Sequence, residues 1–167
     1  MITVRRMEEW DVAAAAKLES ENFSEAWSEQ SFLETLQCDY AYYYVAECEE
    51  LEQMTDVSTE ALYKNTAARK KQKKVVGICG LRNIAGEGEI TNVVTNQAYR
   101  RQGIARTLLQ KVLSDGVELG IEAFTLEVRC SNQPAIALYE KFGFESAGVR
   151  KNFYTNPKED ALIMWKR

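Results

Sequence analysis

A segment near the middle of the chain changes from a strand pattern into a helix pattern within a few residues. An apolar, β-branched run ends at Thr95, and a short polar loop follows it. From residue 101 to residue 118, apolar residues recur at spacings of three and four, which leaves one face of a helix apolar. The spacing predicts an amphipathic helix that opens between Arg101 and Ala105, directly after a strand and a loop.

The start of that helix has the chemistry of an anion site. The first N–H groups of a helix have no partner within the helix and carry partial positive charge, so they attract phosphate. Gly103 permits close approach to the backbone, and Arg100, Arg101 and Arg106 add positive charge. Arginines also begin many helices by chance, so the pattern alone leaves an ordinary helix end as the alternative. The usual ATP and NAD phosphate loops, GxxxxGK(S/T) and GxGxxG, are absent.

The other patterns along the chain give the element order β-α-α-β-β-β-α-β-α-β-β. Mixed order of this kind indicates an α+β domain around one central sheet, and we expect residues 1–167 to form a single domain. Strands are expected at residues 1–7, 41–47, 75–82, 88–95, 124–129, 144–150 and 160–166, and helices at 9–22, 28–36, 101–118 and between Asn132 and Gly143.

A charged insertion is expected at about residues 48–73, between two strands. It begins with acidic residues, has the composition of a short helix from about Ser58, and ends in a basic run from Arg69 to Lys74. A flexible, solvated loop is one interpretation, and contact with ribosomal RNA or an acidic partner is the other.

Composition excludes several kinds of chemistry. The chain has no histidine, which removes Ser-His-Asp and Cys-His catalysis and the zinc sites that need histidine. Its four cysteines are scattered without a CxxC pair, so no metal is expected. The net charge of −4 argues against broad affinity for nucleic acid. No apolar stretch approaches the roughly 20 residues of a membrane span, and the first residues lack a signal-peptide core. We therefore expect a cytoplasmic protein with no membrane contact, as a monomer or weak dimer.

A family resemblance is carried first by the loop and helix start. Residues 100–105 read Arg-Arg-Gln-Gly-Ile-Ala. They resemble the acetyl-CoA signature of the GNAT superfamily of N-acetyltransferases, Gln/Arg-x-x-Gly-x-Gly/Ala, which lies between the fourth strand and the third helix of that fold. The resemblance implies an α+β GNAT fold, with a central mixed, mostly antiparallel sheet flanked by helices, and acetyl-CoA as the acetyl donor.

The same resemblance implies which residues bind acetyl-CoA. Backbone amides from Arg101 to Arg106 would hold the pyrophosphate. A splayed strand before them would pair with the pantetheine arm and leave amides free to polarise the acetyl carbonyl. The implied cofactor-binding set is Val93, Val94, Thr95, Arg100, Arg101, Gln102, Gly103, Ile104, Ala105, Arg106, Asn132 and Tyr139.

Further segments are similar to the RimI-type acetyltransferases, which modify the N-terminal alanine of a ribosomal protein. These segments are residues 127–132, 135–144, 150–154 and 159–164, together with residues 23–28 near the start of the chain. Three positions depart from that pattern: Ala26 stands where proline is usual, Phe153 where tyrosine is usual, and Cys130 at a variable position. The resemblance implies N-terminal acetylation of a protein, with the N-terminus of a ribosomal protein as acceptor. Acetylation of a small amine or a lysine side chain, or a non-catalytic acetyl-CoA-binding module, remain alternatives.

Two residues are expected to carry the catalysis. Glu127 matches the family's glutamate and would act as general base on the amine, directly or through a water. Its alternative role is an ion pair with Arg129. Tyr139 would donate a proton to the departing thiolate, because a phenol is protonated at neutral pH. Its alternative is a packed helix tyrosine, and Asn132 is a helix cap if it does not contact the pantetheine arm.

Three other residues are candidates for binding the acceptor: Trp27, Asn92 and Tyr154. The two aromatic residues would otherwise be part of the core. A covalent route through an acetylated Cys130 would need an activated thiolate, and the chain has no histidine to activate it. Direct transfer within a ternary complex is therefore expected.

Overall fold

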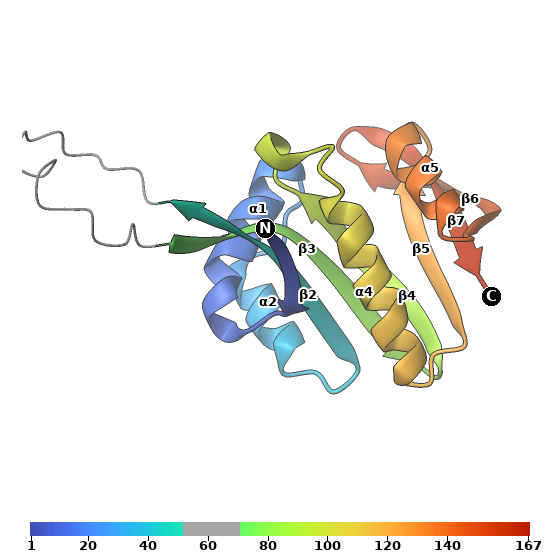
Figure 1. Cartoon of the computed structure of the whole chain (residues 1–167). Coiled ribbons are helices and arrows are strands. Elements are labelled where there is room, and N and C mark those ends of the chain that lie inside the picture. The colour runs from blue at the N-terminus through green and yellow to red at the C-terminus, as the bar shows by residue number, and fades with distance from the viewer. Residues whose placement is uncertain (52–70) are drawn as a thin grey trace, which may run out of the picture.

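Seven strands form one sheet in the computed structural model, which describes residues 1–51 and 71–167 (Figure 1). All neighbouring strands are antiparallel except β4 and β5, which are parallel. The sheet is therefore mixed and mostly antiparallel, as the resemblance implied. In spatial order the strands are β1 (Ile2–Arg6), β2 (Ala41–Leu51), β3 (Lys71–Ile84), β4 (Glu87–Thr95), β5 (Ala123–Arg129), β7 (Lys158–Lys166) and β6 (Glu145–Thr155).

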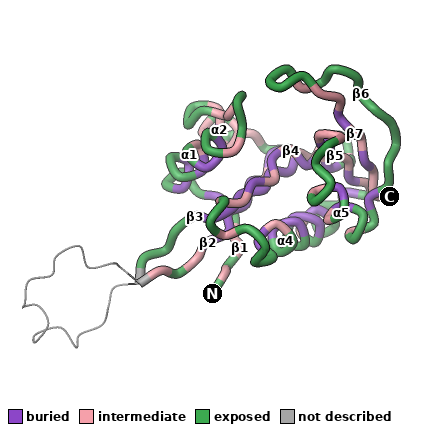
Figure 2. The backbone as a smooth tube through the Cα atoms, turned by 90° about the horizontal axis from the view of Figure 1, so that it is seen from above, coloured by how far each residue is buried: buried purple, intermediate pink, exposed green. Residues whose placement is uncertain are grey.

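Helices cover both faces of the sheet, so that the fold has three layers. Figure 2 shows α1 and α2 on one face and α4 and α5 on the other. The element order is the one expected from the sequence. No helix in the described ranges is long and apolar enough to span a bilayer. Within the described residues the helices are α1 (Val12–Asn22), α2 (Glu29–Leu36), α4 (Ile104–Glu118) and α5 (Gln133–Lys141), with short 3-10 turns η1 (Glu9–Asp11) and η2 (Gln97–Tyr99).

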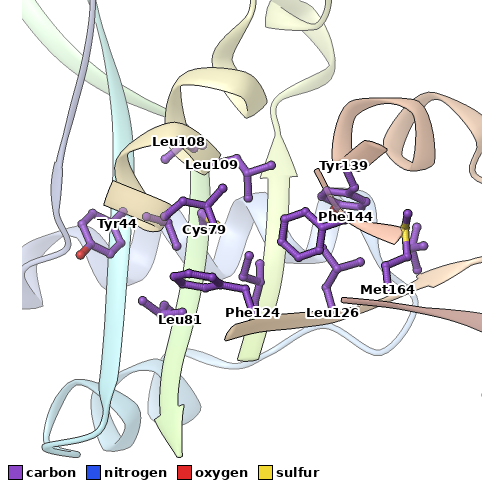
Figure 3. Close-up of a cluster of buried hydrophobic side chains, with 14 of the residues drawn as sticks. Tyr44, Cys79, Leu81, Leu108, Leu109, Phe124, Leu126, Tyr139, Phe144 and Met164 are labelled. Atoms are coloured by element: carbon purple, nitrogen blue, oxygen red, sulfur yellow. The ribbon is translucent and has the colours of Figure 1, made fainter. Parts of the chain in front are cut away.

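Two apolar clusters fill the space between these layers. In Figure 3, Leu108 and Leu109 of α4 lie over Phe124 and Leu126 of β5, and Tyr139 of α5 lies beside the same cluster. A second cluster under α1 and α2 contains Phe32 and Tyr43, both almost fully buried. Each buried side chain of this size contributes about 1.5–3 kcal/mol. The sheet is thereby fixed between its helices, and its strand ends can carry a site.

The start of α4 lies within the expected stretch from Arg101 to Ala105. The helix begins at Ile104 and not at Arg101, because Arg101 (φ 65°) and Gly103 (φ 79°) have left-handed backbone conformations. A helix cannot run through such residues. Residues 100–103 therefore form a separate turn that leads into the helix.

The expected insertion is shorter than the sequence indicated. β2 continues to Leu51 and β3 begins at Lys71, and the two strands are paired along these extensions. Residues 48–51 and 71–73 are therefore strand and not loop. The helix expected from about Ser58 lies outside the described residues. β6 and β7 are likewise longer than expected and form a hairpin between Thr155 and Lys158.

Candidate active site

The parallel pair at the centre of the sheet opens into a splay. β4 and β5 are paired only from Glu87 with Ala123 to Ile90 with Leu126. Beyond these residues β4 stays with β3, and β5 stays with β7. The facing edges of the two strands are then not paired with each other, so this stretch of β4 offers backbone groups to a ligand. The splayed strand implied by the resemblance is present.

A cleft of about 640 Å³ occupies this splay. Its walls are β4 and β5, the connection between α1 and α2, and the hairpin between β6 and β7. Residues that are far apart in the sequence meet there. The candidates that line the cleft are Trp27, Asn92, Val93, Glu127, Asn132, Tyr139 and Tyr154.

The start of α4 has open backbone donors. No side chain caps the helix at Gly103, where the first amides point out of the helix. Arg101, Gln102, Gly103 and Arg106 are exposed, whereas the Ile104 side chain lies in the core, so that residue can offer only its backbone. These residues and Val94 do not line the cleft. The residues from Arg101 to Arg106 lie at the end of the loop that follows β4 and in the first turn of α4, whereas Val94 is a buried residue within β4 itself.

Two further observations concern the loop between β4 and α4. The Thr95 hydroxyl oxygen is buried and has no hydrogen-bond partner among the described residues. A buried hydroxyl without a partner costs free energy, which a ligand that bonds to it would recover. Arg100, by contrast, donates to the Asn22 side chain at 2.9 Å and is held toward α1. The residues present thus fit a polar ligand along the end of β4.

Glu127 projects from β5 toward the cleft. Phe124, Leu126 and Val128 are buried in the core, whereas the Glu127 side chain is 26% exposed. Its carboxylate is paired with Arg150 at 3.0 Å. The sequence offered Arg129 as the alternative ion-pair partner of Glu127. That expectation is wrong, because Arg129 pairs with Glu159.

Arg129 belongs to a separate group at the hairpin end of the cleft. Its guanidinium lies 3.4 Å from Glu159 and stacks over the Tyr154 ring at 4.2 Å. It also donates to the backbone oxygens of Asn156 and Pro157. Tyr154 is half-buried, and burial raises the pKa of its phenol. This group orients the β6–β7 hairpin that forms one wall of the cleft.

Tyr139 lies at the junction of the cleft and the core. Its side chain is 6% exposed, and its ring contacts Phe144 edge-on with centroids 6.0 Å apart. Burial raises the pKa of its phenol above the usual value, so the hydroxyl stays protonated at neutral pH. The described residues accept no hydrogen bond from it, which leaves the proton available for a ligand.

Asn132 is a helix cap as well as a cleft residue. Its side-chain oxygen accepts a hydrogen bond from the Ala135 amide at 3.3 Å, at the start of α5. Both expected roles are therefore compatible. Cys130 follows β5 but does not line the cleft, so the geometry gives no support to a covalent route through its thiol.

The sequence did not reveal Glu19 as a site residue. It lies in α1 at the helical spacing of the buried Ala15, is 1% exposed, and lines the cleft. Asn92 donates to its carboxylate at 2.6 Å, and Tyr43 donates to Asn92 at 2.8 Å. An acidic residue at a core position of an amphipathic helix is the signal that could have indicated it.

The outer side of the cleft is closed by two hydrogen bonds. Ser24 donates to the Asn156 backbone oxygen at 2.6 Å, and Thr155 donates to Glu25. They join the α1–α2 connection to the β6–β7 hairpin.

The sequence matches the acetyltransferase (GNAT) family over residues 12–144. It is 34% identical, over 97% of this chain and 93% of the relative, to a Bacillus subtilis protein that provisionally carries the name of an alanine N-acetyltransferase of ribosomal protein bS18. The Escherichia coli enzyme of that name is 30% identical to this chain, and the match covers 98% of this chain and 96% of the Escherichia coli chain. The crystal structure of the Escherichia coli ribosomal-protein-alanine N-acetyltransferase superposes with a TM-score of 0.76 at 29% identity, covering 99% of this chain and 92% of that one.

Proposed function

Since the chain belongs to the acetyltransferase (GNAT) family, we propose that it transfers the acetyl group of acetyl-CoA to the N-terminal α-amine of a ribosomal protein that begins with alanine. The observation that carries the proposal is the splay between β4 and β5, which brings Glu127 and Tyr139 to one cleft. The names of the full-length relatives support a ribosomal acceptor.

In this proposal acetyl-CoA binds as a substrate along the end of β4. The uncapped amides from Gly103 to Arg106, with Arg101 nearby, would hold the pyrophosphate. The free edge from Val93 to Thr95 would pair with the pantetheine arm, within reach of Asn132. The unpartnered Thr95 hydroxyl supports a polar ligand at this position.

Deprotonation of the acceptor favours an α-amine over a lysine. The α-amine has a pKa of about 7.7–8.0 and lysine about 10.4, so deprotonation at neutral pH costs roughly 3.5 kcal/mol more for lysine. Glu127 would take the proton, directly or through a water. An α-ammonium can therefore be deprotonated by a weaker base than a lysine ammonium requires, and a carboxylate at the cleft wall suffices.

Transfer then proceeds within a ternary complex. The amine nitrogen attacks the acetyl carbonyl, and a free β4 amide stabilises the developing oxyanion. The new C–N bond forms as the C–S bond breaks. Tyr139 donates its proton to the departing thiolate. After the attack the nitrogen carries one proton too many, and it returns that proton through water to the Tyr139 phenolate, which leaves a neutral amide. No acetyl-enzyme is formed. The products are the acetylated N-terminus and CoA.

Location and partners follow from the acceptor. We propose that the enzyme acts in the cytoplasm, where ribosomal proteins are made, as a monomer or weak dimer that recognises the protein N-terminus without binding nucleic acid directly. No group of side chains with metal-ligand chemistry occurs among the described residues, and the proposed steps use only protein groups.

Two peptides test the acceptor assignment. The first begins with a free alanine and contains no lysine, and the second has a blocked N-terminus and an internal lysine. Each is incubated with acetyl-CoA and the protein, and the products are identified by mass spectrometry. The proposal predicts acetylation of the first peptide alone. Acetylation of the second alone would overturn the acceptor assignment, and modification of neither would direct the search to small amines or to a non-catalytic role.

A further inference from the structure

A second carboxylate, that of Glu19, lies in the wall of the same cleft. Its side chain is 1% exposed, yet it lines the cleft together with Asn92 and Trp27. One carboxylate oxygen accepts the Asn92 amide at 2.6 Å, and the other accepts only a long hydrogen bond of 3.5 Å from the Trp27 backbone. The second oxygen therefore retains capacity for a donor.

No cation is paired with Glu19 in the part of the chain that the structure describes. No ion pair within residues 1–51 and 71–167 involves Glu19, whereas Glu127 has Arg150 and Glu159 has Arg129. A buried carboxylate without a cation loses much of its solvation, and hydrogen bonds recover only part of it. Burial accordingly raises the pKa of the Glu19 carboxyl, against the lowering by its hydrogen bonds to Asn92 and Trp27. A cation that enters the cleft would supply the positive charge that the Glu19 carboxylate lacks.

The carboxylate is also held in a fixed orientation. Asn92 donates its amide N–H to Glu19 and accepts the Tyr43 hydroxyl at 2.8 Å, and the same hydroxyl lies 2.8 Å from the Thr91 side chain. Thr91 and Asn92 are the two β4 residues that stand opposite Gly80 in a bulge, just beyond the last pairing of β4 with β5. The network thus places Glu19 where the splay opens.

We propose that Glu19 binds the α-ammonium group of the acceptor and holds it in the cleft until Glu127 takes its proton. This assignment rests on the proposed function. It separates two tasks between two carboxylates: Glu19 supplies an uncompensated charge that attracts a cation, and Glu127, already paired with Arg150, supplies the base. An α-ammonium beside Glu19 would favour its ionised form, because an opposite charge within about 4–6 Å does so.

The test separates charge recognition from a structural role. Binding is measured by calorimetry in saturating CoA with two peptides of one sequence, the first beginning with alanine and the second with a propionyl group, which is alanine without its amine. The wild-type protein should bind the alanine peptide about tenfold or more tightly, the effect of one hydrogen-bonded charge. Glu19→Gln keeps the volume and an acceptor for Asn92, and it should bind both peptides equally.

Two further variants complete the test. Glu21→Gln makes the same substitution on the same helix outside the cleft. It should keep the wild-type ratio between the dissociation constants of the two peptides. Asn92→Ala removes the hydrogen bond that orients the carboxylate but keeps the Glu19 charge, so it should weaken the preference for the alanine peptide without abolishing it. A wild-type ratio in Glu19→Gln, loss of the preference in Asn92→Ala, or a wild-type protein that does not distinguish the peptides would each overturn the inference. Failure of the proposed function is distinct, because the wild-type protein would then not acetylate the alanine peptide at all.

Discussion

The Arg150 guanidinium lies 3.0 Å from the Glu127 carboxylate, and thereby connects β6 to β5 across the intervening strand β7. The Arg150 side chain is 57% exposed. An exposed ion pair contributes about 1 kcal/mol or less, so Arg150→Gln should change kcat by less than about tenfold. Steady-state kinetics with an alanine-starting peptide measures the kcat of Arg150→Gln relative to the wild type. If Arg150→Gln were as inactive as a variant without the Glu127 carboxylate, Glu127 would matter as an ion-pair partner and not as a base.

Gly103→Ala should weaken acetyl-CoA binding. The residue has φ 79°, and no atom lies within 4 Å of an added Cβ, so the substitution adds backbone strain without a clash. The strain costs about 1 kcal/mol and disturbs the amides at the start of α4. Calorimetric titration with acetyl-CoA should show a higher Kd.

Gly120→Ala is the matched control for that substitution. Gly120 also has a left-handed backbone (φ 81°) with open space at its Cβ, but it follows the other end of α4. It should lower the thermal stability to a similar extent and leave the acetyl-CoA Kd unchanged. Equal loss of affinity in both variants would contradict a pyrophosphate site at Gly103.

Tyr139→Phe should lower kcat and leave the fold intact. The phenol packs against Phe144, and its hydroxyl donates to no described residue, so its removal leaves the packing in place. Loss of a general acid typically lowers a rate by about 10²-fold or more. Stopped-flow detection of CoA release, together with the melting temperature, measures both effects. Unchanged CoA release would remove Tyr139 from the mechanism.

Replacing residues 52–70 by Asn-Gly should leave acetyl-CoA binding unchanged. Leu51 and Lys71 are cross-strand partners, so a two-residue turn can join them. The proposed pyrophosphate site lies at Gly103, in a different part of the chain. A titration of the shortened protein with acetyl-CoA compares its Kd with that of the full chain. A large rise in Kd would show that the replaced residues contribute to cofactor binding.

Local patterns were sufficient to predict the order of the elements. Alternating and helical periodicities identified each strand and helix, and short-range chemistry identified the Asn132 cap and the end of a helix before Gly143. The position of the helix start within the expected stretch from Arg101 to Ala105 also has a local cause. Gly103 permits the left-handed conformation that delays the helix, but nothing in the sequence shows that Arg101 shares it.

Long-range relationships could not be predicted in the same way. The pairing of Glu127 with Arg150 depends on a register that shifts between Ser146 and Gly148. Glu19 of α1 accepts a hydrogen bond from Asn92 of β4, and Asn92 in turn accepts one from Tyr43 of β2, so this network becomes visible only when the layers are assembled. A single sequence contains the residues of this network but not their distances.

Acetyl transfer by Glu127→Gln tests most directly whether Glu127 is the base. The amide keeps the size of the side chain and removes the base. If Glu127 is the base, kcat with an alanine-starting peptide should fall by about 10²–10⁴-fold, and the acetyl-CoA Kd should be unchanged. Glu140 is an exposed glutamate on α5, and the matched variant Glu140→Gln should behave as the wild type. Full turnover by Glu127→Gln would contradict the assignment of the base, even if acetyl-CoA still bound.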